Sequence, residues 1–166
     1  VENVLPGMQA AFVDIGYELN AFLPFSEIGE NEYIIEKVTQ KRNSPKNKQN
    51  DKLENIEVDL KTGQEIFVQV IKEPFAGKGP RVTTEVALPG RLLVLVPNAN
   101  YIGISKKIWD KFERRRLKKI AHRLRSKDAG VIIRTVAEGK SEEHIENDFS
   151  ILLDNWKNIK SKSDRN

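Results

Sequence analysis

The strongest candidate for chemistry in this sequence is a run of basic residues at positions 106–127. This stretch of 22 residues holds 11 lysines and arginines against two acids, a formal charge of +9, whereas the whole chain carries +4. Clustered positive charge is the electrostatic signature of a protein that binds a polyanion such as a nucleic acid. The plainer interpretation, the solvated face of an ordinary helix, stays open from the charge pattern alone.

Two phenylalanines lie where strand alternation predicts the more polar faces. Phe12 shares a face with Asp14 in the run 8–15, and Phe22 lies with Asn20 in the run 19–24. The predicted core faces of the two strands consist of Ala11, Val13 and Ile15, and of Leu19, Ala21 and Leu23. Exposed rings can stack on nucleic-acid bases of any sequence, and a ring packed under a loop is the alternative.

No constellation of residues predicts catalysis. His122 lies in the basic run and His144 beside acids, and we interpret both as surface residues. The sequence has no Walker loop, no HExxH or GxSxG motif and no clustered aspartate pair of the two-metal kind. It also has no cysteine, which excludes disulfides and thiolate-bound metals within these residues. By itself the chain is predicted to be a binding module without a metal or cofactor.

Length and composition limit the organisation of the chain. Its 166 residues suit one large domain or two small ones. No run of about 18 apolar residues predicts a membrane span, and no secretion signal is visible. Because the sequence starts at Val1 without an initiator methionine, we expect a piece of a longer protein. The first 36 residues hold seven acids and no base, so the charge is strongly segregated along the chain.

Further strands and two helices are predicted along the rest of the chain. The predicted strands, beyond the two described, cover 66–71, 81–86, 92–96, 102–104 and 130–136. We expect 102–104 to pair with 92–96. Residues 39–52 contain no large apolar side chain, which predicts a flexible insertion at about 39–62.

Each predicted helix has an apolar face. The helix predicted over 108–126 places on that face Trp109, Leu117, Ile120, Ala121 and Leu124. A second helix follows Gly139, with Ser141 as its N-cap. Its apolar stripe consists of Ile145, Phe149, Leu152, Trp156 and Ile159. Because the composition shifts near 85–90, the sequence predicts an α+β protein with a β-barrel at 1–86 and an α+β unit at 87–166.

Three stretches of the sequence resemble the bacterial ribonuclease E/G family. The first is VLPGMQAAFVDIG (4–16) with AFLP (21–24). The second comprises GQEIFVQVIKEP (63–74), GKGPRVTTEVALPGRLLVLVPN (77–98) and GISKKI (103–108), and the third is GVIIRTVAEGKSEE (130–143). The resemblance covers 1–29, 63–108 and 130–160, and it leaves 30–62 and 109–129 unmatched.

The resemblance implies a fold and an activity. The fold would be an S1-type OB-fold, a five-stranded barrel whose first strand is incomplete here, followed by a small α+β 5′-sensor domain. The activity would be that of a cytoplasmic, single-strand-specific endoribonuclease in RNA processing and decay, homo-oligomeric at full length. The family's magnesium-dependent catalytic domain lies C-terminal to this stretch, so we expect the piece to bind RNA without cleaving it. Its partners would be single-stranded RNA and the enzyme's remaining domains.

The family's functional residues are carried over onto nine positions of this sequence. The RNA-contacting positions are Phe12, Phe22, Lys78, Lys106 and Lys107. The positions of the 5′-monophosphate pocket are Gly90, Val94, Arg134 and Thr135. A guanidinium can grip a terminal phosphate through two hydrogen bonds, and a hydroxyl can hold another oxygen. A strand-end charge reaching water is the alternative for Arg134, and a solvated pair is the alternative for the two adjacent lysines.

Two other functions stay open at this stage. One is a non-enzymatic OB-fold RNA-binding protein associated with translation or the ribosome. The other is a structural piece whose basic helix binds an acidic protein surface.

Overall fold

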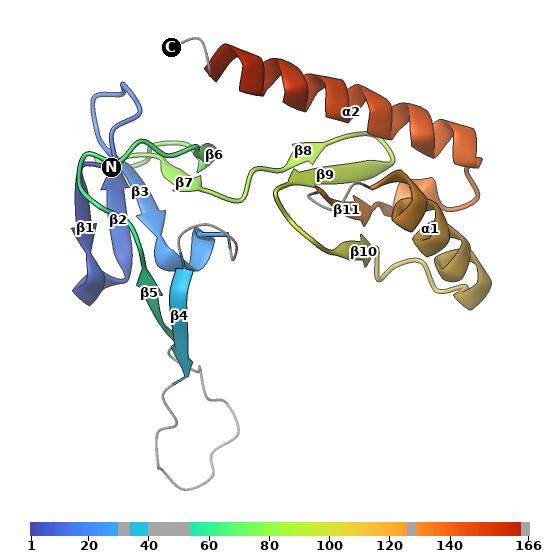
Figure 1. Ribbon diagram of the computed structural model, residues 1–166, viewed down its shortest axis with the longest axis horizontal. Helices are drawn as coiled ribbons and strands as arrows, with labels where there is room; N and C mark the ends of the chain where they lie inside the picture. The colour runs from blue at the N-terminus through green and yellow to red at the C-terminus, as the bar shows by residue number, and fades with distance from the viewer. Residues whose placement is uncertain (30–33, 40–53, 126–128, 164–166) are drawn as a thin grey trace, which may run out of the picture. The chain divides into compact units, whose positions relative to one another are not determined.

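The computed structural model describes residues 1–29, 34–39, 54–125 and 129–163 of the chain, which forms two compact units, Val1–Glu85 and Val86–Asn166. Each unit has its own sheet and its own hydrophobic core (Figure 1). The α+β class predicted from the sequence is confirmed. The units divide between Glu85 and Val86, and the boundary expected from the sequence lies between residues 86 and 87.

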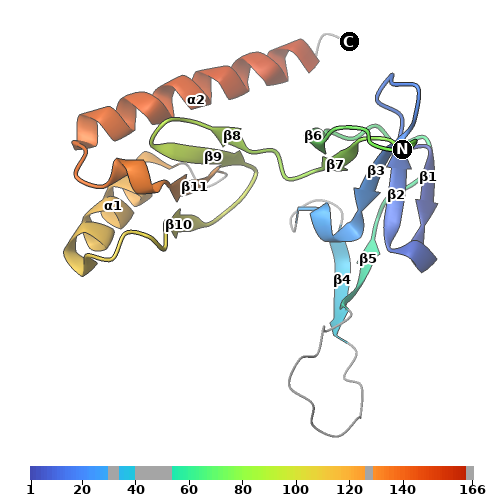
Figure 2. The same ribbon diagram turned by 180° about the vertical axis from the view of Figure 1, so that it is seen from behind.

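A five-stranded sheet forms the centre of the first unit. Its strands, in spatial order, are β1 (Asn3–Leu5), β2 (Ala10–Val13), β3 (Ala21–Pro24), β7 (Arg81–Thr83) and β6 (Gln69–Lys72). β3 and β7 pair in parallel, and all other neighbours are antiparallel. Short 3-10 helices, η1 and η2, follow β1 and β3 at Pro6–Met8 and Phe25–Glu27. A two-stranded ribbon of β4 (Ile34–Thr39) and β5 (Glu54–Val58) extends beyond this sheet (Figure 2).

Alternation predicted the inner face of β2 and β3 only within the strands themselves. The residues buried as predicted are Ala11, Val13, Ala21 and Leu23. Ile15 and Leu19 are instead 37% and 42% exposed. The reason is that β2 ends before both, where the Asp14 carboxylate accepts a hydrogen bond from the N–H of Gly16, a residue with a φ of 75°. Side-chain alternation has no meaning in such a turn.

Two further predictions for the first unit are wrong in extent. The insertion expected to be flexible at about 39–62 includes β5, and the side chains of Ile56 and Leu60 are buried in the core of the unit. Residues 40–53 of that insertion lie outside the described part of the chain. The strand predicted over 66–71 begins only at Gln69, and its Val70 and Ile71 are exposed. A continuous apolar run therefore did not indicate a fully buried strand here.

The second unit contains a four-stranded sheet. Its strands, in spatial order, are β10 (Ile102–Ile104), β11 (Ala129–Ile133), β9 (Leu93–Pro97) and β8 (Leu88–Pro89). β10 pairs with β11 in parallel, not with β9 as predicted. The helix α1 (Lys111–Leu124) connects these two parallel strands, and parallel neighbours require a crossover of this kind. A prediction based on proximity in the sequence could not detect it.

Two helices complete the second unit, and Figure 1 shows α2 (Glu142–Ser163) running along β8 and β9. The core between sheet and helices includes Leu93, Leu95, Val131, Ile133, Leu117, Ile120, Ile145 and Phe149. The 3-10 helix η3 (Thr135–Ala137) precedes α2. The Ser141 hydroxyl accepts a hydrogen bond from the His144 N–H at 3.3 Å, which agrees with the predicted N-cap. No helix in the described ranges is long and apolar enough to cross a membrane.

The predicted stripe of α2 is largely confirmed, whereas the predicted face of α1 is wrong at one position. Ile145, Phe149 and Leu152 are buried and Trp156 packs against the same core, but Ile159 is exposed. In α1, the helix begins only at Lys111, with Asp110 as its N-cap. Trp109 therefore precedes the helix, outside its phase, and is 86% exposed, while its neighbour Ile108 is buried.

Candidate nucleic-acid interface

Phe12 and Phe22 lie directly opposite each other on β2 and β3. Their ring centroids are 5.8 Å apart and the ring planes are inclined at 56°. Both side chains are half-buried, whereas their strand neighbours Ala11 and Leu23 are fully buried on the other face. Strand register therefore fixes two aromatic rings side by side on a partly exposed surface, as cross-strand pairing does. Partly exposed rings held in this way can stack on bases.

Lys78 lies at the end of a tight turn close to this pair. The turn is closed by two hydrogen bonds between the backbones of Phe75 and Lys78. The next residue, Gly79, passes so close to the residue before β3 that a Cβ on it would collide with the Asn20 carbonyl oxygen. The Phe22 N–H then donates to the Pro80 carbonyl at 2.8 Å. Lys78 is exposed, and it lies three residues before Arg81, which pairs with Phe22.

The basic residue opposite Phe22 has an internal partner. The Arg81 guanidinium donates to the Glu27 carboxylate at 3.0 Å, so its charge is neutralised within the unit. The first unit carries 10 basic and 14 acidic side chains, a formal −4. Local positive charge for a polyanion at the ring pair therefore comes from exposed lysines such as Lys78 and Lys72, which pairs with Arg81 across β6 and β7.

In the second unit, three of the four predicted pocket residues come together near the end of β11: Gly90, Arg134 and Thr135. Arg134 follows this strand, and its Nη1 donates to the Gly90 carbonyl at 2.7 Å. The Thr135 hydroxyl is 2.6 Å from that of Ser105. Val94 lies on β9, half-buried, and pairs with Pro89, the residue before Gly90. Residues 44 positions apart in the sequence, Gly90 and Arg134, are thus in contact. The Arg134 guanidinium is exposed, whereas the hydroxyl pair of Thr135 and Ser105 is partly buried.

The conformation of the Gly90 segment depends on a residue that sequence analysis missed. The Asp148 carboxylate of α2 accepts hydrogen bonds from the N–H groups of Arg91, Leu92 and Leu93, at 3.1, 2.8 and 3.2 Å. A Cβ on Gly90 would lie 2.6 Å from Asp148 Oδ2. These three N–H groups already hold an internal anion. A bound phosphate would therefore have to be held by side chains such as Arg134 and Thr135. An acid in an amphipathic helix gives no sequence signal for such a contact.

Lys106 and Lys107 lie in the turn between β10 and α1, and both are exposed. Arg114 fixes this turn, because its Nη1 donates to the carbonyls of Ser105 and Ile108 at 2.7 and 3.0 Å. Ser105 also contacts Thr135 through its hydroxyl. The lysine pair therefore begins one residue from a group that touches the predicted pocket.

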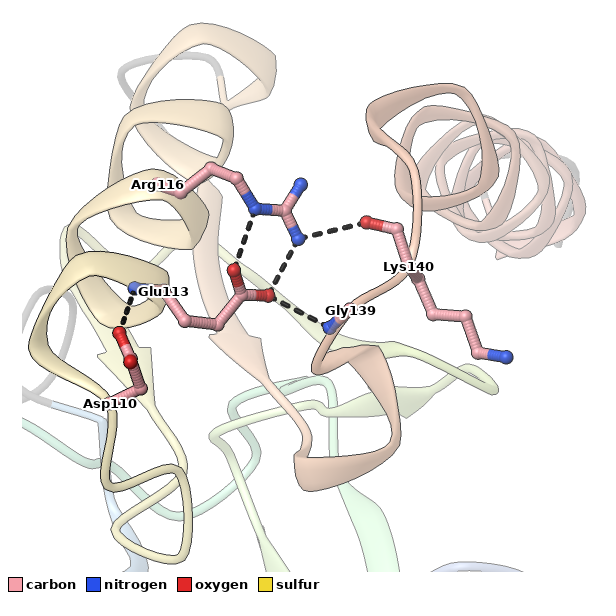
Figure 3. Close-up of polar contacts among 5 residues, drawn as sticks. All are labelled: Asp110, Glu113, Arg116, Gly139 and Lys140. Atoms are coloured by element: carbon pink, nitrogen blue, oxygen red, sulfur yellow. Dashed lines mark hydrogen bonds and ion pairs between the residues drawn. The ribbon is translucent and has the colours of Figure 1, made fainter.

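Figure 3 shows how a second arginine of α1 is used within the fold. Arg116 forms a two-pronged ion pair with Glu113, at 2.8 and 2.6 Å, and also donates to the Lys140 carbonyl at 2.9 Å. The same Glu113 carboxylate accepts from the Gly139 N–H at 2.9 Å. The bonds from Arg116 and then from Gly139 lower the pKa of Glu113 to about 2, against a partial desolvation that raises it. The ion pair raises the pKa of Arg116. This network joins α1 to the loop before α2.

The basic run thus contains cations of two kinds. Four arginines have partners within the unit: Arg114 and Arg116 as described, Arg123 with Glu142, and Arg125 with Asn100. Among the described residues, six cations of the run make no such contact: Lys106, Lys107, Lys111, Arg115, Lys118 and Lys119. No sequence pattern separates the two sets of cations.

Comparison with known proteins decides the family. A family model described as "Ribonuclease E/G family" matches residues 87–166. Ribonuclease G of Salmonella typhimurium is 39% identical over 165 residues, which cover 99% of this chain and 32% of that protein. Ribonuclease G of Haemophilus influenzae is 40% identical over 96% of this chain and 31% of its own length. Ribonuclease E of a Nostoc species is 37% identical over 98% of this chain and 22% of its own length. The chain belongs to the ribonuclease E/G family.

The similarity to the ribonuclease E/G family includes both units. The family model covers nearly all of the second unit, with Arg134, Thr135 and helix α1. The relatives align in addition with the first unit, so the ring pair and Lys78 lie inside the aligned region. The chain spans about a third of the length of the ribonuclease G relatives. Within the described ranges, no group of three histidines or acids could hold a metal ion.

Proposed function

We propose that this chain is the RNA-recognition part of a ribonuclease E/G-type endoribonuclease that acts on single-stranded RNA. The first unit binds RNA through Phe12, Phe22 and Lys78. The second unit holds the 5′-terminal monophosphate of the RNA through Arg134 and Thr135, beside Gly90 and Val94. Lys106 and Lys107 contact the RNA nucleotides that follow this 5′ end. The observation that supports the proposal is the contact of the exposed Arg134 guanidinium with the Gly90 carbonyl, with Thr135 directly following Arg134 and bonded to Ser105.

The topology of the first unit supports an OB-fold as the basis for RNA binding. If β6 and β7 are counted as the fourth and fifth strands of its sheet, the spatial order is 1-2-3-5-4, with a parallel pairing between the third and fifth. Near the free edge of β1, the Gly63 N–H donates to the Val1 carbonyl at 2.8 Å, and the Val1 amino group contacts the Gln64 carbonyl. The chain that leads to β6 thus passes beside the opposite edge of the sheet, as closure of a small barrel requires.

Cleavage itself is assigned to parts of the enzyme other than these residues. Those parts would supply the magnesium-dependent chemistry that the resemblance implies; the described ranges contain no group of three histidines or acids that could hold a metal ion. The cytoplasmic location and the homo-oligomer of the full-length enzyme belong to the same proposal. The ribonuclease names of the relatives favour this function over a translation-associated RNA-binding protein.

The test is a titration of the chain with matched oligoribonucleotides that carry a 5′-monophosphate or a 5′-hydroxyl. We expect the wild-type chain to prefer the 5′-monophosphate and Arg134→Ala to lose that preference, with Lys160→Ala, an exposed lysine in the last turn of α2, as the charge-matched control. The Phe12→Ala/Phe22→Ala variant should lower the affinity of the chain for both RNAs by about ten-fold or more. Equal binding of the two RNAs by the wild-type chain would refute 5′-end sensing by this chain.

A further inference from the structure

Trp109 and Phe112 have the highest exposed fractions of the large apolar side chains in the described ranges, 86% and 80%. They lie on either side of the N-cap residue of α1, three positions apart. Before and after them in the sequence, Ile108 and Leu117 are buried in the core, at 1% and 0% exposure. The two rings therefore have no packing role in the unit, although their exposure to water is unfavourable. No role is assigned to them by the resemblance, which does not cover 109–129.

Side-chain hydrogen bonds hold the backbone beneath these rings. The Asp110 carboxylate caps α1 by accepting from the Glu113 N–H at 2.8 Å. Arg114 ties the carbonyls of Ser105 and Ile108 to the helix. Trp109 precedes the N-cap, where an apolar residue often packs against the first turn of a helix. Its exposure shows that this packing does not occur here, so the ring faces solvent beside a hydrogen-bonded helix start.

The surroundings of the two rings are strongly cationic. On α1, Phe112, Arg115 and Lys119 follow a spacing of three and four residues, so they share one side of the helix. All three are exposed, and neither cation has a described partner. Lys106, Lys107 and Lys111 flank Trp109 in the sequence and are likewise exposed. Of the two acids in the run, Glu113 is bound by Arg116 and Asp110 caps the helix.

We propose that Trp109 and Phe112, with the cations around them, form a stacking site for bases of single-stranded RNA, which we call the α1 platform. Rings that stack on bases and unpaired cations that contact phosphates are the two components of sequence-independent single-strand binding. Ser105 connects the platform to the candidate phosphate pocket, because its hydroxyl contacts Thr135 and Lys106 follows it directly. This inference rests on the proposed function, and it extends the RNA path of the second unit onto α1.

Tryptophan fluorescence tests the platform directly. The chain has two tryptophans, Trp109 and Trp156, so a Trp156→Phe variant of the full chain leaves Trp109 as the single reporter. We expect an oligouridylate to quench the fluorescence of Trp109 in a saturable manner, whether the RNA carries a 5′-monophosphate or a 5′-hydroxyl. No change in fluorescence at RNA concentrations that saturate the chain would overturn the proposal.

The affinity of variants gives the second measurement. The double variant Trp109→Ala/Phe112→Ala should lower the affinity for both RNAs by about ten-fold and retain the ratio of the two affinities. Arg134→Ala should change that ratio and retain the quenching of Trp109. The control is Ile151→Ala, an exposed apolar residue of α2. Because both platform rings are exposed, circular dichroism and the melting temperature should match those of the wild-type chain. Unchanged RNA affinity, or quenching by vesicles of anionic phospholipid but not by RNA, would refute an RNA site.

Discussion

The two units combine aromatic rings and positive charge in opposite proportions. In Val1–Glu85, Phe12 and Phe22 are fixed by strand register on a unit of formal charge −4. In Val86–Asn166, with 18 basic and 10 acidic side chains, the exposed rings lie at a helix start within a strongly basic surface. Net charge is therefore a poor guide to available charge, since part of the positive charge of the second unit is bound internally.

The largest expected effect tests whether the two units are independent in stability. Phe149→Ala removes a buried ring from the core of the second unit and should cost about 3–5 kcal/mol. Because the core of the first unit consists of other residues, its amide protons should retain their protection. Native-state hydrogen exchange with mass spectrometry would check this, unit by unit. Loss of protection in both units together would show that they unfold cooperatively.

A smaller effect is expected at Gly90, where the candidate pocket depends on close packing. A Cβ there would meet Asp148 Oδ2 at 2.6 Å, Leu152 Cδ1 at 2.8 Å and the Leu93 carbonyl oxygen at 2.9 Å. Gly90→Ala should therefore destabilise the second unit by about 1–3 kcal/mol and reduce the preference for 5′-monophosphate.

The matched control lies in the first unit. A Cβ on Gly7 would meet no atom within 4 Å beyond its chain neighbours. Gly7→Ala should therefore leave the free energy of unfolding and the preference for 5′-monophosphate unchanged. Chemical denaturation and RNA titration of the two variants would separate the cases, and equal stability of both would contradict the packing argument.

The Glu113 network predicts how the stability of the second unit depends on pH. The pKa of Glu113 is lowered to about 2 in the folded protein, from an ordinary 4.5, so the carboxylate stabilises the fold at pH values above about 5. This stabilisation is lost as the pH falls from about 5 to 2. Glu113→Gln should cost roughly 1–2 kcal/mol at pH 7 and progressively less toward pH 3.

Urea unfolding of the Glu113→Gln and wild-type chains at both pH values measures this difference. The control is Glu146→Gln, an exposed carboxylate on α2 without a described hydrogen bond, which should leave the free energy of unfolding at pH 7 unchanged. A difference between Glu113→Gln and wild type that is independent of pH would argue against the network as the source of the stabilisation.

The smallest effect on stability is expected at Arg115, and it separates free from bound cations. Arg115→Ala should change the free energy of unfolding by less than about 0.5 kcal/mol, since the side chain is exposed and has no described partner. It should lower the salt dependence of RNA binding by about 0.7 log units per log unit of salt. Arg116→Ala is the counterpart and should reduce stability instead. The same behaviour for both variants would remove the distinction between the two sets of cations.

Sequence reasoning succeeded where the chain obeys a local period. Alternation within β2 and β3 placed Phe12 and Phe22 on the partly exposed face, and helical spacing identified the buried residues of α2. It failed at the ends of elements. Ile15 and Leu19 lie beyond the strands, and Trp109 precedes the first residue of α1, so in each case the period had already stopped.

The sequence alone determined the class of the protein, the composition of its two halves and the family to which its motifs are similar. Only the tertiary structure decided which charges and rings are available. It bound Arg114 to carbonyls of the turn before α1 and Arg116 to the carbonyl of Lys140, and it directed Asp148 to the backbone of 91–93. It also left Trp109 and Phe112 in solvent. The physical reason is that these outcomes depend on which tertiary contacts form and which do not, and no local period encodes them.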